Sequence, residues 1–118
     1  SILPLWIETL VAGIFITLTL EGNSKFKERL KDMGSKVFFF EARDIKKSFY
    51  ILMDDGEIKV IPHYKGEPHV TMRGDTKTLL GLLLNKVDPD TVFFSRELEI
   101  SGDTSAAIHF KNILNSLS

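Results

Sequence analysis

The chain has 118 residues, of which 43% are hydrophobic and 26% are charged, and its formal net charge is -1. This size fits one globular domain with a hydrophobic core, and the near balance of 15 basic and 16 acidic residues lacks the basic excess of a nucleic-acid binder. The absence of cysteine excludes disulfides and thiolate metal sites, and with no recognisable secretory leader it favours the cytoplasm.

The first 22 residues are unusually apolar. The stretch ILPLWIETLVAGIFITLTL carries one charge, Glu8, and apolar side chains all around a helix. A membrane span needs about 20 apolar residues and would have to include Pro4 and Glu8, so it is the weaker interpretation. We expect an apolar N-terminal helix over residues 1–22 that serves as a lid, a dimer contact or a dock on a membrane, followed by the main domain over residues 23–118.

A helix and a strand are predicted next. NSKFKERLKDM has three apolar residues at helical spacing among charged ones, a polar cap at Asn23 or Ser24, and a stop at Gly34. KVFFFEA, residues 36–42, is aromatic and apolar on both faces. This pattern predicts a strand in the centre of a sheet.

Two further strands are predicted to form a hairpin, and a fourth strand follows. SFYILMDDGEIKVIPH contains Asp55-Gly56, which is typical of a tight turn with positive φ between two strands. HVTMR predicts the fourth strand, with Val70 and Met72 facing inward. Because consecutive strands joined by short turns pair antiparallel, we expect a mainly antiparallel sheet.

The remaining elements are a Leu-rich helix, a fifth strand and a closing helix. GDTKTLLGLLLNKV predicts a helix capped by Asp75 or Thr76, with an apolar stripe that extends to Val87. The same Gly-Asp-Thr sequence precedes the last helix, where Asp103 is the expected cap. Together the elements predict a two-layer α+β fold with a five-stranded sheet covered by helices. The helices carry more apolar surface than one sheet face needs, which indicates an apolar ligand or partner.

The chain shows no pattern of a catalytic or metal site. His63, Glu67 and His69 surround one turn, but zinc requires three or four ligands of fixed geometry, so we expect ordinary surface residues. A hydrolytic triad around His109 would need Asp103, which is expected to cap a helix. We therefore predict no catalysis, no cofactor and no metal.

The stretch DPDTVFF places two adjacent phenylalanines after an acidic turn. Pro89 fits the first turn of a helix and Asp90 favours its dipole, so the acidic pair is better explained by turn formation than by acid–base chemistry. Phe93 and Phe94 follow on a short helical turn, where adjacent positions diverge by about 100°. Either one ring fills the layer between the sheet and the helices while the other covers that layer, or Phe94 lines a cavity between the sheet and the Leu-rich helix.

The segment KVDPDTVFFSRELEISGDTSAAIHFKNIL resembles the C-terminal half of the sterol carrier protein 2 lipid-binding domain family. The likeness covers residues 23–117 and is specific over residues 75–114, where a Leu-rich helix, an Asp-Pro turn, two aromatics, a Leu-x-Ile strand and a Gly-Asp cap follow one another. DPDTVFF and RELEISGDT are especially similar to bacterial accessory proteins of ubiquinone biosynthesis that carry this domain. Arg96-Glu97 departs from the Gly-Lys of animal members, which argues against a sterol carrier in the narrow sense.

This resemblance implies helices and a sheet around an apolar tunnel, and non-catalytic binding or transfer of a polyprenyl quinone precursor, a fatty acyl chain or a phospholipid. The implied role is that of an accessory factor to lipid or quinone biosynthesis, cytoplasmic and peripheral to the membrane. Implied partners are the lipid and biosynthetic enzymes, and the apolar first helix adds a transiently contacted membrane and a second copy of the chain as expected partners. The alternative is a homodimerising or docking module with a filled core. The candidate lipid contacts are Leu79, Leu83, Phe93, Phe94, Ile100, Phe110 and Leu114.

Overall fold

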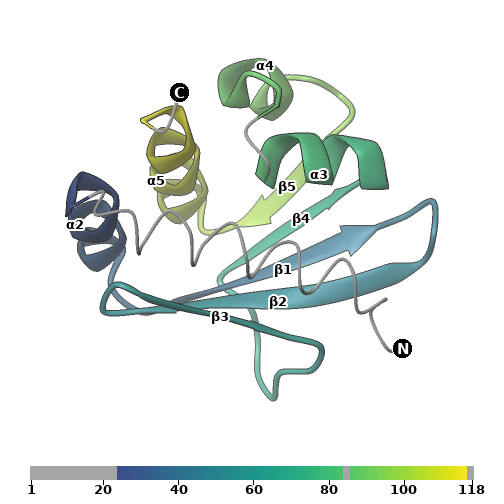
Figure 1. The fold of residues 1–118 in the computed structure, drawn as a ribbon. Helices are drawn as coiled ribbons and strands as arrows, with labels where there is room; N and C mark the ends of the chain where they lie inside the picture. The colour runs from purple at the N-terminus through teal and green to yellow at the C-terminus, as the bar shows by residue number, and fades with distance from the viewer. Residues whose placement is uncertain (1–23, 84–85, 117–118) are drawn as a thin grey trace.

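Five strands form one sheet, and the helices lie over one of its faces (Figure 1). The computed structural model describes residues 24–83 and 86–116, so the apolar helix predicted over residues 1–22 lies outside the described residues. The predicted two-layer α+β fold with a five-stranded sheet is confirmed. In chain order the elements are α2 (Ser24–Met33), β1 (Lys36–Ala42), β2 (Lys47–Asp54), β3 (Glu57–Ile61), β4 (Val70–Gly74), α3 (Thr76–Leu83), α4 (Pro89–Phe93), β5 (Glu99–Gly102) and α5 (Thr104–Asn115).

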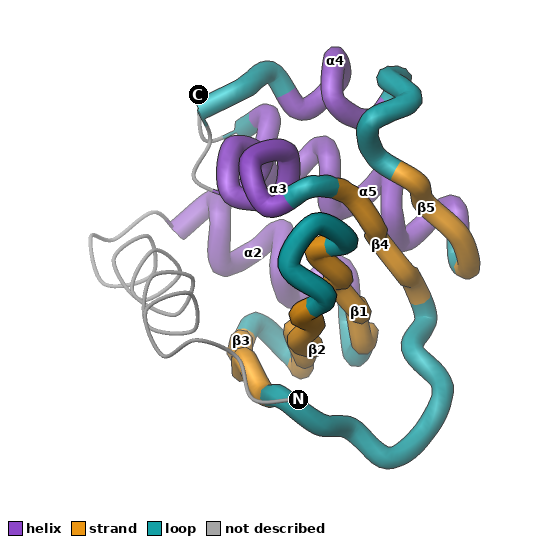
Figure 2. Tube along the Cα trace, turned by 90° about the vertical axis from the view of Figure 1, so that its right-hand side faces the viewer, coloured by secondary structure: helices purple, strands orange, loops and turns teal. Residues whose placement is uncertain are grey.

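The strand order is β3-β2-β1-β4-β5, with β1 in the centre as predicted. β2 and β3 form the predicted antiparallel hairpin, and Asp55 and Gly56 have positive φ angles of 50° and 87°. The expectation of consecutive antiparallel pairing is wrong for β4, which pairs parallel to β1. Residues 62–69 carry the chain beneath the sheet to the far side of β1 (Figure 2), and β5 then pairs antiparallel with β4.

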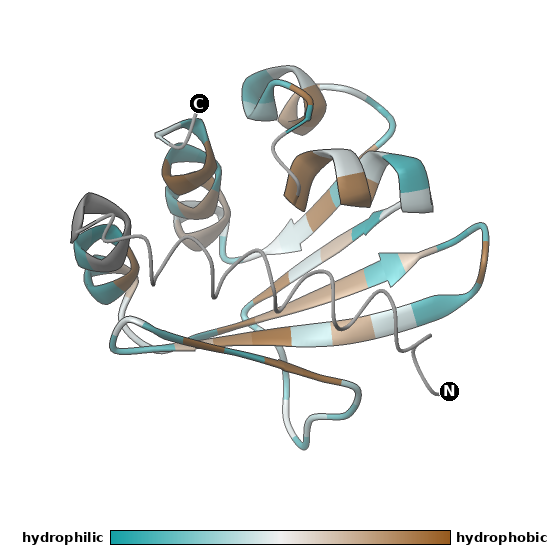
Figure 3. Cartoon of the chain, in the orientation of Figure 1, coloured by the Kyte–Doolittle hydropathy of each residue, from teal (hydrophilic) through white to brown (hydrophobic). Residues whose placement is uncertain are grey.

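The core lies between the sheet and the helices, and its centre is aromatic. Phe38 and Phe40 of β1 are fully buried, and their ring centroids lie 5.0 Å and 6.1 Å from that of Phe110 in α5. Phe40 also stacks on Phe49 of β2 at 5.3 Å. Figure 3 shows hydrophobic residues along α3 and α5, the helices that cover this part of the sheet. Because α5 contributes Phe110 at this point, its position over the sheet is set by the aromatic core.

The opposite face of the sheet is aromatic in its middle. Successive side chains along a strand point to opposite faces of the sheet. Phe38 and Phe40 are buried under the helices, so Phe39 between them points away from the helices. Its ring centroid lies 4.9 Å from that of Tyr50, which lies 5.7 Å from that of Tyr64 in the β3–β4 connection. The connection therefore packs onto this face through Tyr64.

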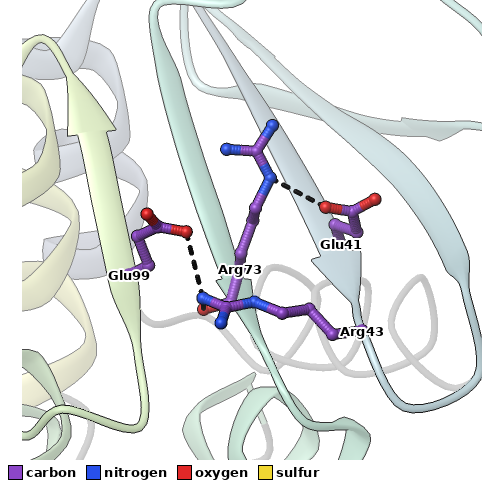
Figure 4. Close-up of polar contacts among 4 residues, drawn as sticks. All are labelled: Glu41, Arg43, Arg73 and Glu99. Atoms are coloured by element: carbon purple, nitrogen blue, oxygen red, sulfur yellow. Dashed lines mark hydrogen bonds and ion pairs between the residues drawn. The ribbon is translucent and has the colours of Figure 1, made fainter.

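Two ion pairs lie beside β4 (Figure 4): one joins β4 to β1, and the other joins the residue that follows β1 to β5. The Arg73 Nε–H donates to Glu41 Oε1 at 2.7 Å, and the Arg43 guanidinium lies 3.0 Å from Glu99 Oε2. These side chains are more than one-third exposed, so each pair contributes about 1 kcal/mol at most. Their main effect is to make this end of the sheet polar.

The two helices that follow Gly-Asp-Thr are capped differently. In α5 the Asp103 carboxylate accepts a hydrogen bond from the Ala106 N–H at 3.1 Å, as predicted. In α3 the acceptor comes from a distant loop, because Asp44 Oδ1 binds the Thr76 N–H at 2.9 Å and its hydroxyl at 2.8 Å. The predicted local cap by Asp75 or Thr76 is thus replaced by a tertiary contact.

A pH prediction follows from the α5 cap. The hydrogen bond from the Ala106 N–H and the neighbouring Lys36 ammonium lower the pKa of Asp103. The pKa of Asp103 is therefore lower in the folded state than in the unfolded state, where it is about 4, so its ionised carboxylate stabilises the folded protein above pH 4. This stabilisation is lost as the pH falls through the folded-state pKa. We expect Asp103→Asn to lower the melting temperature at pH 6, with the difference from the wild type shrinking towards pH 2. A difference that stays constant over this range would contradict the assigned cap.

Candidate lipid-binding groove

A groove of about 250 Å³ lies between α4, β5 and α5. Its wall is mostly apolar, and of the described residues that line it, one, Lys111, is charged. The volume is just below the range of about 300–1,000 Å³ typical of small-molecule sites, so the groove suits one narrow apolar chain better than a bulky ligand. The lining residues are Phe93, Phe94, Ile100, Ser101, Gly102, Thr104, Ala107, Ile108 and Lys111.

The two adjacent phenylalanines at the end of the short helix α4 point in different directions, as predicted. Pro89 occupies its first turn, and the Thr91 hydroxyl donates to Asp88 Oδ2 at 2.8 Å. Phe93 is half-buried against the core, whereas Phe94, at the C-terminal cap, is 83% exposed. Phe93 therefore joins the groove to the core, and Phe94 stands at its rim.

Gly102 holds the end of β5 tightly against the neighbouring backbone. Its φ is +102°, and a Cβ atom there would overlap the carbonyl oxygen of His69. The same carbonyl accepts a hydrogen bond from the Asp103 N–H at 2.7 Å, and His69 Nδ1 accepts one from the Val37 N–H at 2.9 Å. One end of the groove is therefore built on a close backbone junction between β1, β4 and α5.

Lys111 is nearly buried at the groove. Its side chain is 14% exposed, and its Nζ atom lies 2.7 Å from Asp90 Oδ1 and 5.6 Å from the centroid of the Phe94 ring. The hydrogen bond from Lys111 lowers the pKa of Asp90, which keeps that carboxylate ionised. The Asp90 side chain is 50% exposed, but its Oδ1 atom, which faces Lys111, is buried, and Asn115 is a second hydrogen-bond partner of this carboxylate.

Three of the seven predicted lipid contacts, Phe93, Phe94 and Ile100, line the groove. Leu79 and Leu83 line a separate hollow of about 20 Å³ beneath α3, which is too small for a lipid chain. The predicted stripe of α3 is shorter than expected, because Val87 lies beyond the helix and is 41% exposed. The last two contacts, Phe110 and Leu114, are buried in the core.

Sequence reasoning missed Ile108 and Lys111 as parts of the groove. Ile108 lies away from the buried face of α5 and is 47% exposed. An exposed isoleucine off the core stripe of a helix was the available signal. Lys111 gave no signal, because its partner Asp90 belongs to another helix.

The residues weighed above as metal or triad candidates can be located in the described part of the chain. They contain no group of three or more His, Asp or Glu side chains placed to hold a metal ion. Among the same residues, no helix has the length and apolarity of a membrane span. His69 Nδ1 accepts a hydrogen bond from the Val37 N–H, and Asp103 caps α5, so both residues have structural roles.

Comparisons with known proteins agree with this architecture. Residues 16–115 match the SCP-2 sterol transfer family. The ubiquinone biosynthesis accessory factor UbiT of Escherichia coli (strain K12) is 32% identical over 98 residues, which cover 79% of this chain and 55% of UbiT. The chain thus spans about half the length of the curated relatives it matches.

Two solved structures show the same fold at low sequence identity. The ubiquinone synthesis protein UbiJ-SCP2 superposes with a TM-score of 0.70 at 19% identity, covering 96% of this chain and 99% of that one. Palmitated SCP2L2 from Aedes aegypti superposes with a TM-score of 0.56 at 16% identity, covering 77% and 88%.

Proposed function

The chain belongs to the SCP-2 sterol transfer family, and from that premise we propose that it binds a hydrophobic lipid without converting it chemically. The observation that carries this proposal is the apolar groove of about 250 Å³ between α4, β5 and α5. Each methylene removed from water contributes about 0.8 kcal/mol, so a chain of several methylenes is held without a specialised polar site. The palmitated relative supports an acyl chain as a ligand for this fold.

The similarity to UbiT supports a more specific role. We place the domain as a cytoplasmic accessory factor of quinone or lipid biosynthesis that presents an apolar intermediate to biosynthetic enzymes. Contact with a membrane surface supplies or receives the lipid, since water is a poor acceptor for it. Residues 1–22 would serve as the lid, the dimer contact or the membrane dock beside the lipid-binding domain of residues 23–118.

The lipid contacts are proposed to lie chiefly along the groove. Phe93, Phe94 and Ile100 retain the role expected of them, and Ala107 and Ile108 join them from α5. Leu79, Leu83, Phe110 and Leu114 lie in the packed layer behind the groove and would contact a lipid only if it entered further.

The alternative is an interaction module with a filled core. It is favoured by one observation: the hollow between the sheet and α3 has a volume of about 20 Å³ and admits no lipid. Sedimentation of the detergent-free protein, with and without residues 1–20, separates the two functions. A dimer that dissociates without residues 1–20, in a protein that takes up no lipid, would favour the interaction module.

A charge placed in the groove should reduce lipid binding. We expect Ile108→Glu to weaken the binding of palmitate at least tenfold, because a carboxylate would lie beside the apolar chain and repel its anionic head group. Val87→Glu is the matched control, since Val87 has a similar exposure of 41% but does not line the groove. Equilibrium dialysis with radiolabelled palmitate measures both variants. Equal affinities in the two variants would exclude the groove as the binding site.

A further inference from the structure

We propose that the contact of Asp90 with Lys111 and Asn115 forms an end wall of the groove, and that this wall sets the longest stretch of apolar chain that the groove holds. The inference rests on the proposed function, and it adds the residues that determine specificity for chain length. Lys111 lines the groove itself, whereas Asp90 and Asn115 are positioning residues that act through Lys111.

Along α5 the groove ends at Lys111. Thr104, Ile108 and Lys111 follow one side of the helix at spacings of four and three residues, and all three line the groove. The next residue on this side, Asn115, does not line the groove and is a hydrogen-bond partner of Asp90 in α4. The groove therefore stops where side chains of the two helices meet.

The contact at this end is short and buried. Lys111 Nζ lies 2.7 Å from Asp90 Oδ1, and that oxygen is buried. The Lys111 side chain is 14% exposed, and the centroid of the Phe94 ring lies 5.6 Å from its Nζ atom. Separating a buried ion pair is costly, because each charge is then left without its partner in a poorly solvated place. An apolar chain cannot supply a replacement partner, so it should end at this contact.

The position of α4 depends on α5. α4 packs chiefly against α5 and to a lesser extent against α3. On either side of α4 the chain is held at other points, because Val87 lies against Gly81, and the Glu97 carbonyl oxygen lies 2.9 Å from where a Cβ of Gly74 would be. Between these points Asp90 is the one charged residue of α4. Its ion pair with α5 therefore fixes the place where the two helices close the groove.

The two ends of the groove define its length. The close junction at Gly102 forms one end, and Lys111 forms the other. From Thr104, beside that junction, to Lys111 the helix rises about 10 Å at about 1.5 Å per residue. An extended chain of about eight carbons covers this distance at about 1.2 Å per bond. Further carbons of a longer chain should stay in contact with water.

The test measures affinity against chain length with n-alkanols from hexanol to tetradecanol in equilibrium dialysis, so that no charged head group is involved. We expect the wild-type affinity to rise about fourfold per methylene up to about eight to ten carbons and to level off beyond. Lys111→Ala combined with Asp90→Ala removes the wall without leaving either charge unpaired. Because the lysine stem is about four carbons long, the levelling-off should move to chains about two to four carbons longer.

Two further variants are controls. Arg73→Ala combined with Glu41→Ala removes another ion pair of 2.7 Å, on the face of the sheet away from the helices, so the levelling-off should stay where it is in the wild type. Lys111→Arg keeps a cation beside Asp90 and should admit no longer chain than the wild type does.

The outcomes separate this inference from the function beneath it. A wild-type affinity that keeps rising to tetradecanol, or a levelling-off that stays in place in the double variant at Lys111 and Asp90, overturns the end wall and leaves lipid binding in place. Failure of the wild type to bind any alkanol overturns the proposed function itself. If the double variant does not fold, as judged by its circular dichroism, Asp90→Ala alone decides the question. That substitution frees Lys111 to turn towards water, so an unchanged levelling-off in it overturns the end wall.

Discussion

Phe110→Ala is expected to lower the free energy of unfolding by about 3–5 kcal/mol, which is the usual cost of removing a buried phenylalanine ring. Phe110 is 1% exposed, and its ring meets those of Phe38 and Phe40 at the centre of the core. The substitution would leave a cavity under α5 and remove the contact that positions this helix on the sheet. Small domains are stable by about 5–15 kcal/mol, so the loss is a large fraction of the total.

Phe94→Ala is the matched control, because the chemical change is identical and Phe94 is 83% exposed. We expect it to change the free energy of unfolding by about 0.5 kcal/mol or less. Urea denaturation followed by circular dichroism measures both variants. A similar, small effect in both would mean that Phe110 borders an open ligand cavity rather than a filled core.

Gly102→Ala is expected to destabilise the protein by about 3 kcal/mol or more. The φ of +102° alone costs an L-residue about 1–3 kcal/mol. The new Cβ would also overlap the His69 carbonyl oxygen, which is backbone and cannot move aside as a flexible side chain could. The hydrogen bond from the Asp103 N–H to that carbonyl would be disturbed as well, so α5 would start from a displaced position.

Gly34→Ala separates backbone strain from the steric overlap. Gly34 also has a positive φ, of +71°, but a Cβ atom there meets nothing within 4 Å. We expect Gly34→Ala to cost about 1–2 kcal/mol, as a left-handed backbone conformation does. Thermal unfolding of the two variants side by side gives the difference. If Gly102→Ala were no worse than Gly34→Ala, the close junction beneath the groove would not exist as described.

Features that depend on near neighbours were predictable from the sequence. The run of aromatics in residues 36–42 identified the central strand, and Asp55-Gly56 identified the hairpin because few residues adopt positive φ at low cost. The Asp103 cap was predictable for the same reason, since its acceptor and donor lie three residues apart.

Features that depend on residues far apart in the sequence could not be predicted from it. The parallel pairing of β4 with β1 is decided by packing after the chain has crossed beneath the sheet, and no local pattern records it. The cap of α3 comes from Asp44, far from Thr76 in the sequence. The groove likewise combines one side of α4 with the side of α5 that lies off its core stripe. Sequence periodicity identified the core face of α5 and therefore directed attention to Phe110 and Leu114 rather than to Ile108 and Lys111.

The central claim is that an apolar chain lies in the groove between α4, β5 and α5. The most direct test is a solution NMR titration of the isotope-labelled protein with palmitate, followed through backbone amide and side-chain methyl signals. We predict saturable shifts concentrated at Phe93, Phe94, Ile100, Ala107 and Ile108. Shifts concentrated instead on the opposite face of the sheet, at Phe39 and Tyr50, or no saturable shift at all, would contradict the account.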